Sequence, residues 1–132
     1  MSRQLLLLPL LLLFVPAGCG DSSGLGATTS LQITVWPQGK ASASISYSLS
    51  CPQGTGTLPE APAACSKLQR IDVSAFAPVP PGTACTEIYG GPQIARVSGR
   101  LAGKSISADF SRSDGCQIAR WSRLAFLFPT PP

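Results

Sequence analysis

Alternation of apolar and polar residues predicts four β-strands in this chain. Residues 31–36 alternate, and residues 45–50 repeat the pattern after a turn. Further along, residues 95–101 place their apolar side chains on one parity, and residues 106–110 do the same after a second turn. A period of two is typical of a strand that buries one face. We therefore expect two antiparallel hairpins.

Helical spacing replaces this alternation in two other segments. Apolar residues recur at intervals of three and four from Ala61 to Ile71, and Pro62 fits the first turn of a helix. Closer to the C-terminus, Ser113 can cap a short helix that carries Cys116. The spacing thus predicts two helices.

The last apolar segment predicts a further strand. Residues 124–128, Leu-Ala-Phe-Leu-Phe, are apolar on both faces, which is the pattern of a buried central strand. All the elements together predict an α+β fold: a single small domain with an antiparallel sheet of about five strands and two helices.

The N-terminal segment predicts export. Residues 1–18 combine Arg3 with an apolar run too short to span a bilayer, which is typical of a secretory signal peptide. Pro16-Ala17-Gly18-Cys19 then resembles a lipobox, in which Cys19 becomes lipidated and holds the protein on the outer face of the cell membrane. Pro16 departs from the bulky aliphatic residue usual at that place. The alternative is ordinary secretion with a spare cysteine, and either reading places the protein outside the cell.

Composition predicts how the rest of the chain is divided. Residues 19–30 form a lipidated cysteine and a flexible tether rich in Gly, Ser and Thr. Residues 31–128 form the folded domain, and residues 129–132 form a disordered tail.

Charge and composition exclude several classes of function. The formal net charge is +4, but the basic residues are spread along the chain and do not interleave with aromatic residues, so we expect no nucleic-acid partner. The chain has no histidine, which excludes Ser-His-Asp and Cys-His catalysis and any histidine metal site. We expect neither an enzyme nor a cofactor.

The cysteines separate into Cys19 and a set of four. The four are Cys51, Cys65, Cys85 and Cys116. An even set in an exported chain predicts two disulfides, and spacing alone leaves all three pairings open. A zinc site is the competing interpretation of four thiols, but the sequence has no Cys-X-X-Cys pair and the compartment is oxidising.

Three local patterns surround the four cysteines. A strand ends at a cysteine, and Gly and Pro loop residues follow it before Ala-Ala-Cys at residues 63–65 opens a helix. The segment Cys-Thr-Glu-Ile-Tyr at residues 85–89 precedes a strand hairpin. Ser-Asp-Gly-Cys at residues 113–116 comes before the last apolar segment. In their order and spacing over residues 34–128, these patterns resemble the Streptomyces subtilisin inhibitor family of serine protease inhibitors.

This resemblance implies a function, a disulfide pairing and a set of site residues. The implied pairs are Cys51–Cys65 and Cys85–Cys116. The residue two after the third cysteine is the primary-specificity residue of the family, so the implied reactive bond is Glu87–Ile88. The loop that would contact a protease consists of Ala84, Cys85, Thr86, Glu87, Ile88, Tyr89 and Gly90.

The implied mechanism is tight, substrate-like binding of a rigid loop to a subtilisin-like or glutamate-specific serine endopeptidase. Asp114 lies where the family often has an amide side chain that supports the loop, and a carboxylate there is a departure, because it accepts but does not donate hydrogen bonds. The resemblance leaves a homodimer open. The alternative function is a non-inhibitory cell-envelope lipoprotein that keeps the inhibitor fold as a binding module.

Overall fold

The computed structural model describes residues 27–131, in which the four predicted strands form one antiparallel sheet. The predicted signal peptide, Cys19 and most of the predicted tether lie outside the described residues. In the sheet the strands follow the order β2-β1-β3-β4. The strands are β1 (Thr29–Trp36), β2 (Ile45–Cys51), β3 (Ile94–Leu101) and β4 (Lys104–Ser111). No helix of this part of the chain is long and apolar enough to cross a membrane.

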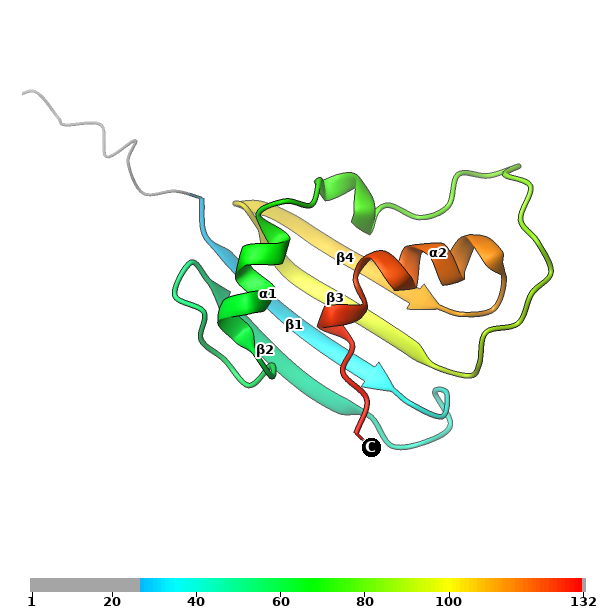
Figure 1. The fold of residues 1–132 in the computed structure, drawn as a ribbon, viewed down its shortest axis with the longest axis horizontal. Coiled ribbons are helices and arrows are strands. Elements are labelled where there is room, and N and C mark those ends of the chain that lie inside the picture. Colours follow the sequence, from blue (N-terminus) through cyan, green and yellow to red (C-terminus); the bar gives the residue numbers. More distant parts are fainter. Residues whose placement is uncertain (1–26, 132) are drawn as a thin grey trace, which may run out of the picture.

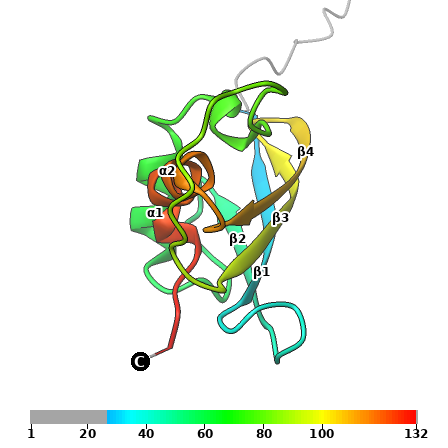
Figure 2. The ribbon, with the colours of Figure 1, turned by 90° about the vertical axis from the view of Figure 1, so that its right-hand side faces the viewer.

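Both predicted helices lie on the same face of the sheet, as Figures 1 and 2 show. The helix α1 (Ala61–Leu68) packs on β2, and α2 (Gly115–Arg123) packs on β4. Two short 3-10 helices, η1 (Val73–Phe76) and η2 (Ala125–Leu127), complete this layer. The fold is therefore the expected small α+β domain, with two layers around one core.

Strand register explains why the core lies on one side of the sheet. Ile33 of β1 stands opposite Tyr47 of β2 and Val97 of β3, and its side chain is fully buried. The next residue, Thr34, faces the other side and stands opposite Arg96. The largest fully buried side chains are Phe110, Leu31, Ile33, Leu49, Leu124, Leu127, Val35 and Val97. The alternation in the sequence thus separates a hydrophobic face from a polar one.

The prediction of a strand at residues 124–128 is wrong, and the sheet has four strands rather than five. Leu124 follows the last residue of α2 as its C-cap, and η2 begins directly after it. Leu124 and Leu127 are completely buried, and the ring of Phe128 lies 4.6 Å from that of Trp121. Leu124, Leu127 and Phe128 are apolar because they pack into the core, whereas Ala125 is exposed and Phe126 is partly buried. Periodicity does not separate such a segment from a buried strand.

Two predicted boundaries also shift. The first strand begins at Thr29, inside the predicted tether, and the hydroxyl of Thr29 accepts a hydrogen bond of 3.0 Å from the backbone N–H of Ala102. At the other end, the carbonyl of Pro129 accepts a hydrogen bond of 3.4 Å from the hydroxyl of Tyr47. Both ends of the domain therefore contact the sheet.

Arg120 fixes α2 against the sheet. Its guanidinium lies 4.6 Å from the centre of the Phe110 ring and donates hydrogen bonds to the carbonyls of Asp109 (3.1 Å) and Phe76 (3.5 Å). Burial lowers the pKa of Arg120, an effect that the nearby Asp109 carboxylate opposes. A helix held in this way is a firm support for whatever is attached to its first turn.

Candidate functional site

The segment that the sequence singled out is an irregular loop before β3. It follows the proline-rich residues 78–81, and residues 83–91 contain neither helix nor strand. The first residue of β3, Ile94, pairs with Trp36 at the end of β1. The loop and the beginning of β1 consequently lie at opposite ends of the molecule (Figure 1).

A disulfide ties the start of this loop to the first turn of α2. Cys85 and Cys116 are bonded, with their Cα atoms 5.4 Å apart. The other bond joins Cys51 to Cys65, at 5.6 Å between Cα atoms, and links the end of β2 to α1. Both disulfides implied by the resemblance are present in the structure.

Two backbone hydrogen bonds fix the loop on either side of the implied reactive bond. The N–H of Gly115 donates to the carbonyl of Thr86 at 2.9 Å. The N–H of Gly90 donates to the carbonyl of Arg112 at 2.7 Å. Arg112 lies just before α2 and Gly115 is the first residue of α2, so one rigid support holds both sides of residues 87–89.

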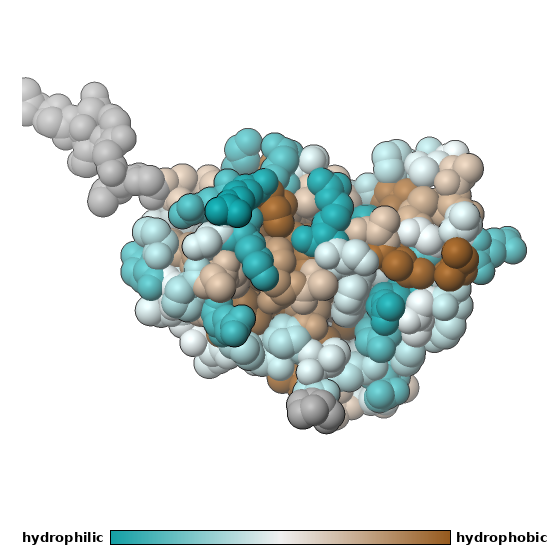
Figure 3. All heavy atoms as spheres, in the orientation of Figure 1, coloured by the Kyte–Doolittle hydropathy of each residue, from teal (hydrophilic) through white to brown (hydrophobic). Residues whose placement is uncertain are grey.

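The residues between these two hydrogen bonds project into solvent. Ile88 is 60% exposed and Tyr89 is 68% exposed, and Glu87 is exposed beside them. Only Val73 joins Ile88 and Tyr89 as an exposed large hydrophobic residue among those that the structure describes. Figure 3 shows hydrophobic surface at the end of the molecule where α2 and the loop meet. Adjacent exposed apolar side chains on a fixed loop are typical of a surface that binds another protein.

Asp114 stabilises α2, the helix to which the loop is attached through Gly115 and Cys116. Its side chain accepts a hydrogen bond of 2.9 Å from the backbone N–H of Gln117, so Asp114 is the N-cap of α2. The prediction of Ser113 for this role is wrong. The Ser113 hydroxyl instead lies 3.1 Å from that of Ser111. A cap of this kind stabilises a helix by about 1 kcal/mol. Asp114 thus bears on the loop through the first turn of α2.

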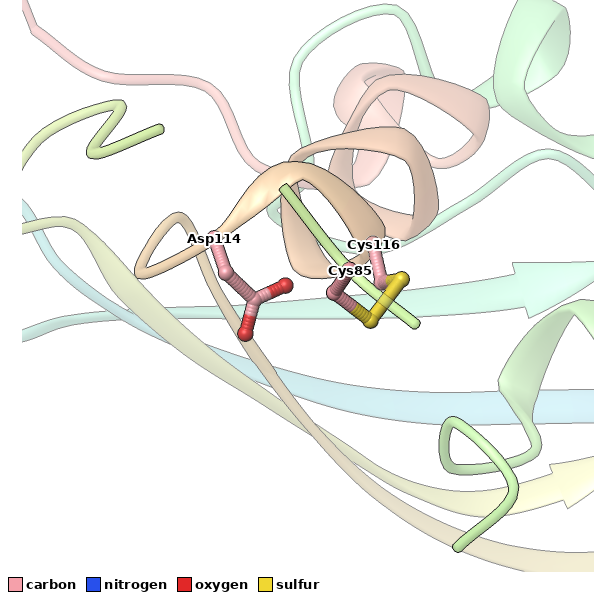
Figure 4. A group of neighbouring side chains, drawn as sticks. All are labelled: Cys85, Asp114 and Cys116. Atoms are coloured by element: carbon pink, nitrogen blue, oxygen red, sulfur yellow. A yellow bond between two sulfur atoms is a disulfide. The ribbon is translucent and has the colours of Figure 1, made fainter. Parts of the chain in front are cut away.

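Cys85, Asp114 and Cys116 lie close together (Figure 4). Their potential ligand atoms are all within 4.8 Å of one another. The two sulfur atoms are joined in a disulfide, so this group has no thiolate to offer a metal ion. It is a structural group that connects the loop to α2.

Two close approaches at this site were not foreseen from the sequence. An added Cβ at Gly90 would lie 2.9 Å from Cγ1 and Cδ1 of Ile118, and a Cβ at Gly115 would overlap the side chain of Thr86. Gly115 belongs to the Ser-Asp-Gly-Cys pattern and Gly90 to the predicted loop, but the sequence did not indicate that either glycine packs closely against another segment. Ile118 gave no signal, because its contact with the loop depends on how α2 is placed.

Comparison with known proteins gives matches among solved structures and none in sequence. No family model matches the chain, and no curated protein sequence matches it. Among solved structures it matches Streptomyces caespitosus sermetstatin, which was crystallised in complex with Bacillus licheniformis subtilisin. The two chains are 22% identical, the match covers 76% of this chain and 99% of sermetstatin, and the TM-score is 0.49. At this identity the likeness concerns the fold.

Proposed function

We propose that this protein inhibits a serine endopeptidase by presenting residues 84–90 as a substrate-like loop. The observation that carries the proposal is the attachment of both sides of the exposed Glu87–Ile88 peptide to the segment from Arg112 to Cys116. Ordering a loop on binding costs affinity, and a loop that is already fixed avoids most of this cost. The sequence patterns around the cysteines support the same function.

In this mechanism the backbone of the loop pairs with the protease cleft as an added strand. The side chain of Glu87 enters the primary-specificity pocket, while Ile88 and Tyr89 contact the leaving-group side. The Cys85–Cys116 disulfide holds the acyl side of the bond if the protease cuts it. A protease with a pocket built for glutamate fits the proposal best, and a subtilisin-like enzyme with a broad apolar pocket fits it less well.

The proposed location is the outer face of the cell membrane, through lipidated Cys19. The position of the loop supports this arrangement, because the chain enters the domain at Thr29, at the opposite end of the sheet. An anchor on the N-terminal side would direct the loop away from the membrane surface (Figure 1).

The test is inhibition by the purified mature protein of three proteases: a subtilisin-like, a trypsin-like and a glutamate-specific enzyme. We expect concentration-dependent inhibition that is strongest for the glutamate-specific enzyme. Circular dichroism should show that the protein in the assay is folded. A folded protein that inhibits none of the three would exclude the proposal and favour the non-inhibitory lipoprotein instead.

A further inference from the structure

Gly90 lies where the loop approaches α2 closely enough to crowd any added side chain. An added Cβ there would lie 2.9 Å from Cγ1 and Cδ1 of Ile118 and 3.2 Å from Cβ of Arg112. The backbone of Gly90 is not among those with a positive φ, so an alanine there would be disfavoured by crowding against Ile118 and Arg112 and not by backbone conformation. Gly90 is half-buried, whereas Ile88 and Tyr89 just before it are exposed.

The residues that follow Gly90 fold back on the same support. The Gly90 N–H donates to the Arg112 carbonyl at 2.7 Å, and the Arg112 guanidinium donates to the side-chain carbonyl of Gln93 at 3.4 Å. That carbonyl lies directly beside Gly91, which has a φ of +129°. Residues 90–93 therefore contact Arg112 through both backbone and side-chain hydrogen bonds.

The two sides of the Glu87–Ile88 bond are held by different means. A disulfide and the Thr86–Gly115 hydrogen bond hold the acyl side. The leaving side has the hydrogen bond and the packing of Gly90, two residues beyond Ile88. Hydrolysis of the bond consumes one water and gives a carboxylate at Glu87 and an ammonium group at Ile88, and resynthesis releases that water. Resynthesis is favoured when the two new ends stay close together.

We propose that Gly90 and Ile118 are positioning residues that retain the new amino terminus at Ile88 after the loop is cut. This inference rests on the proposed function, because it concerns the fate of the same loop. On the leaving side, the contact between Gly90 and Ile118 serves the purpose that the Cys85–Cys116 disulfide serves on the acyl side. Intact and cut protein would then interconvert on the protease instead of the cut form being released.

A double-mutant cycle tests the contact. The mature protein and its variants Gly90→Ala, Ile118→Ala and Gly90→Ala/Ile118→Ala are incubated with a catalytic amount of a glutamate-specific endoprotease. The ratio of cut to intact protein is then measured by mass spectrometry until it is constant. Gly90→Ala should raise this ratio roughly tenfold, because the added Cβ displaces the loop from α2. The double variant should return toward the wild-type ratio, because the methyl group added at position 90 fills the space that the shortened side chain at position 118 leaves.

Ser122→Ala is the control, because Ser122 is an exposed residue of α2, and its ratio should equal that of the wild type. Thermal unfolding of each variant shows whether the fold is intact. A wild-type ratio for Gly90→Ala, or no rescue in the folded double variant, would overturn the inference. If Gly90→Ala does not fold, Ile118→Ala alone decides the question, and an unchanged ratio in that variant overturns the inference.

A second readout separates this inference from the proposed function. Hydrogen exchange at the backbone N–H of residue 90, measured by NMR without a protease, should be slow in the wild type, fast in Gly90→Ala and slow again in the double variant. A wild type that inhibits no protease but shows this pattern would refute only the proposed function. Fast exchange in the wild type would refute the positioning contact.

Discussion

Glu87 carries the only charge between the two backbone hydrogen bonds that fix the loop, and its side chain is exposed. An apolar pocket would have to remove water from this carboxylate without offering a cation. Such burial costs several kcal/mol unless the group is neutralised or reaches water. A pocket designed for glutamate provides the missing partner. The identity of this one residue thus sets which class of protease the loop should bind.

Substitution of Glu87 should therefore change specificity. Glu87→Leu should strengthen inhibition of a subtilisin-like protease by roughly tenfold or more, and Glu87→Lys should redirect inhibition to a trypsin-like enzyme. Inhibition constants across the three proteases check this expectation. Glu60→Gln is the control, because Glu60 lies at the start of α1 and its side chain forms no capping hydrogen bond. Equal inhibition by every variant would show that Glu87 is not the primary-specificity residue.

Ala102 is a second residue whose conformation matters. It has a φ of +47°, and Gly103 after it has a φ of +79°, in the turn between β3 and β4. A hairpin turn with a positive φ at both central residues favours Asn-Gly, since alanine is strained there. Ala102→Asn should stabilise the protein by about 0.5–1 kcal/mol in urea unfolding, and Gly103→Ala should destabilise it. Stabilisation by both substitutions would contradict this account of the turn.

Among the elements, the strands were predicted well because their signal is local. The alternation in residues 95–101 and 106–110 follows from burial of one sheet face, and the structure pairs these strands in register. The strand predicted at residues 124–128 is wrong because a continuous apolar run has no periodicity that distinguishes a strand from a helix. The loop was found through its cysteines, whereas the contact of Ile118 with Gly90 depends on the placement of α2 and has no local signature.

The pairing of β3 with β4 also gives a pH prediction. Arg96 and Asp109 stand directly opposite each other, with Nε 2.7 Å from the carboxylate. The hydrogen bond from Arg96 is the main reason that the pKa of Asp109 lies below its ordinary value. A lowered pKa in the folded state means that the stabilisation is present above the unfolded pKa and is lost as the pH falls through the folded one.

Asp109→Asn should accordingly reduce the free energy of unfolding by about 0.5 kcal/mol at pH 7, a small effect because both side chains are at least half exposed. The difference from the wild type should shrink as the pH falls through the lowered pKa of Asp109 and disappear below it. Urea unfolding at pH 7 and at successively lower pH values measures it. A difference that persists in acid would show that the ion pair is not its source.

At the scale of the whole molecule, the two disulfides have separate tasks. Cys51–Cys65 lies in the core, and Cys85–Cys116 joins the loop to α2. Replacing the first pair by alanine should lower the free energy of unfolding by about 3 kcal/mol and leave inhibition largely intact in the folded fraction. Replacing the second pair should raise the inhibition constant at least about tenfold, because the loop is then ordered only on binding. Equal losses of inhibition would contradict this division.

The proposed anchor lies on the N-terminal side of the domain, and the loop lies at the opposite end of the sheet. The chain enters the sheet at Thr29, and the loop precedes Ile94 at the other end. Cys19→Ser should release the protein into the medium, whereas the wild type should stay in the membrane fraction. Because the loop points away from the anchored end, the inhibition constants of the released and vesicle-bound forms against a soluble protease should agree within about twofold, since the same contacts form in both cases. Much weaker inhibition by the bound form would mean that the membrane covers the loop.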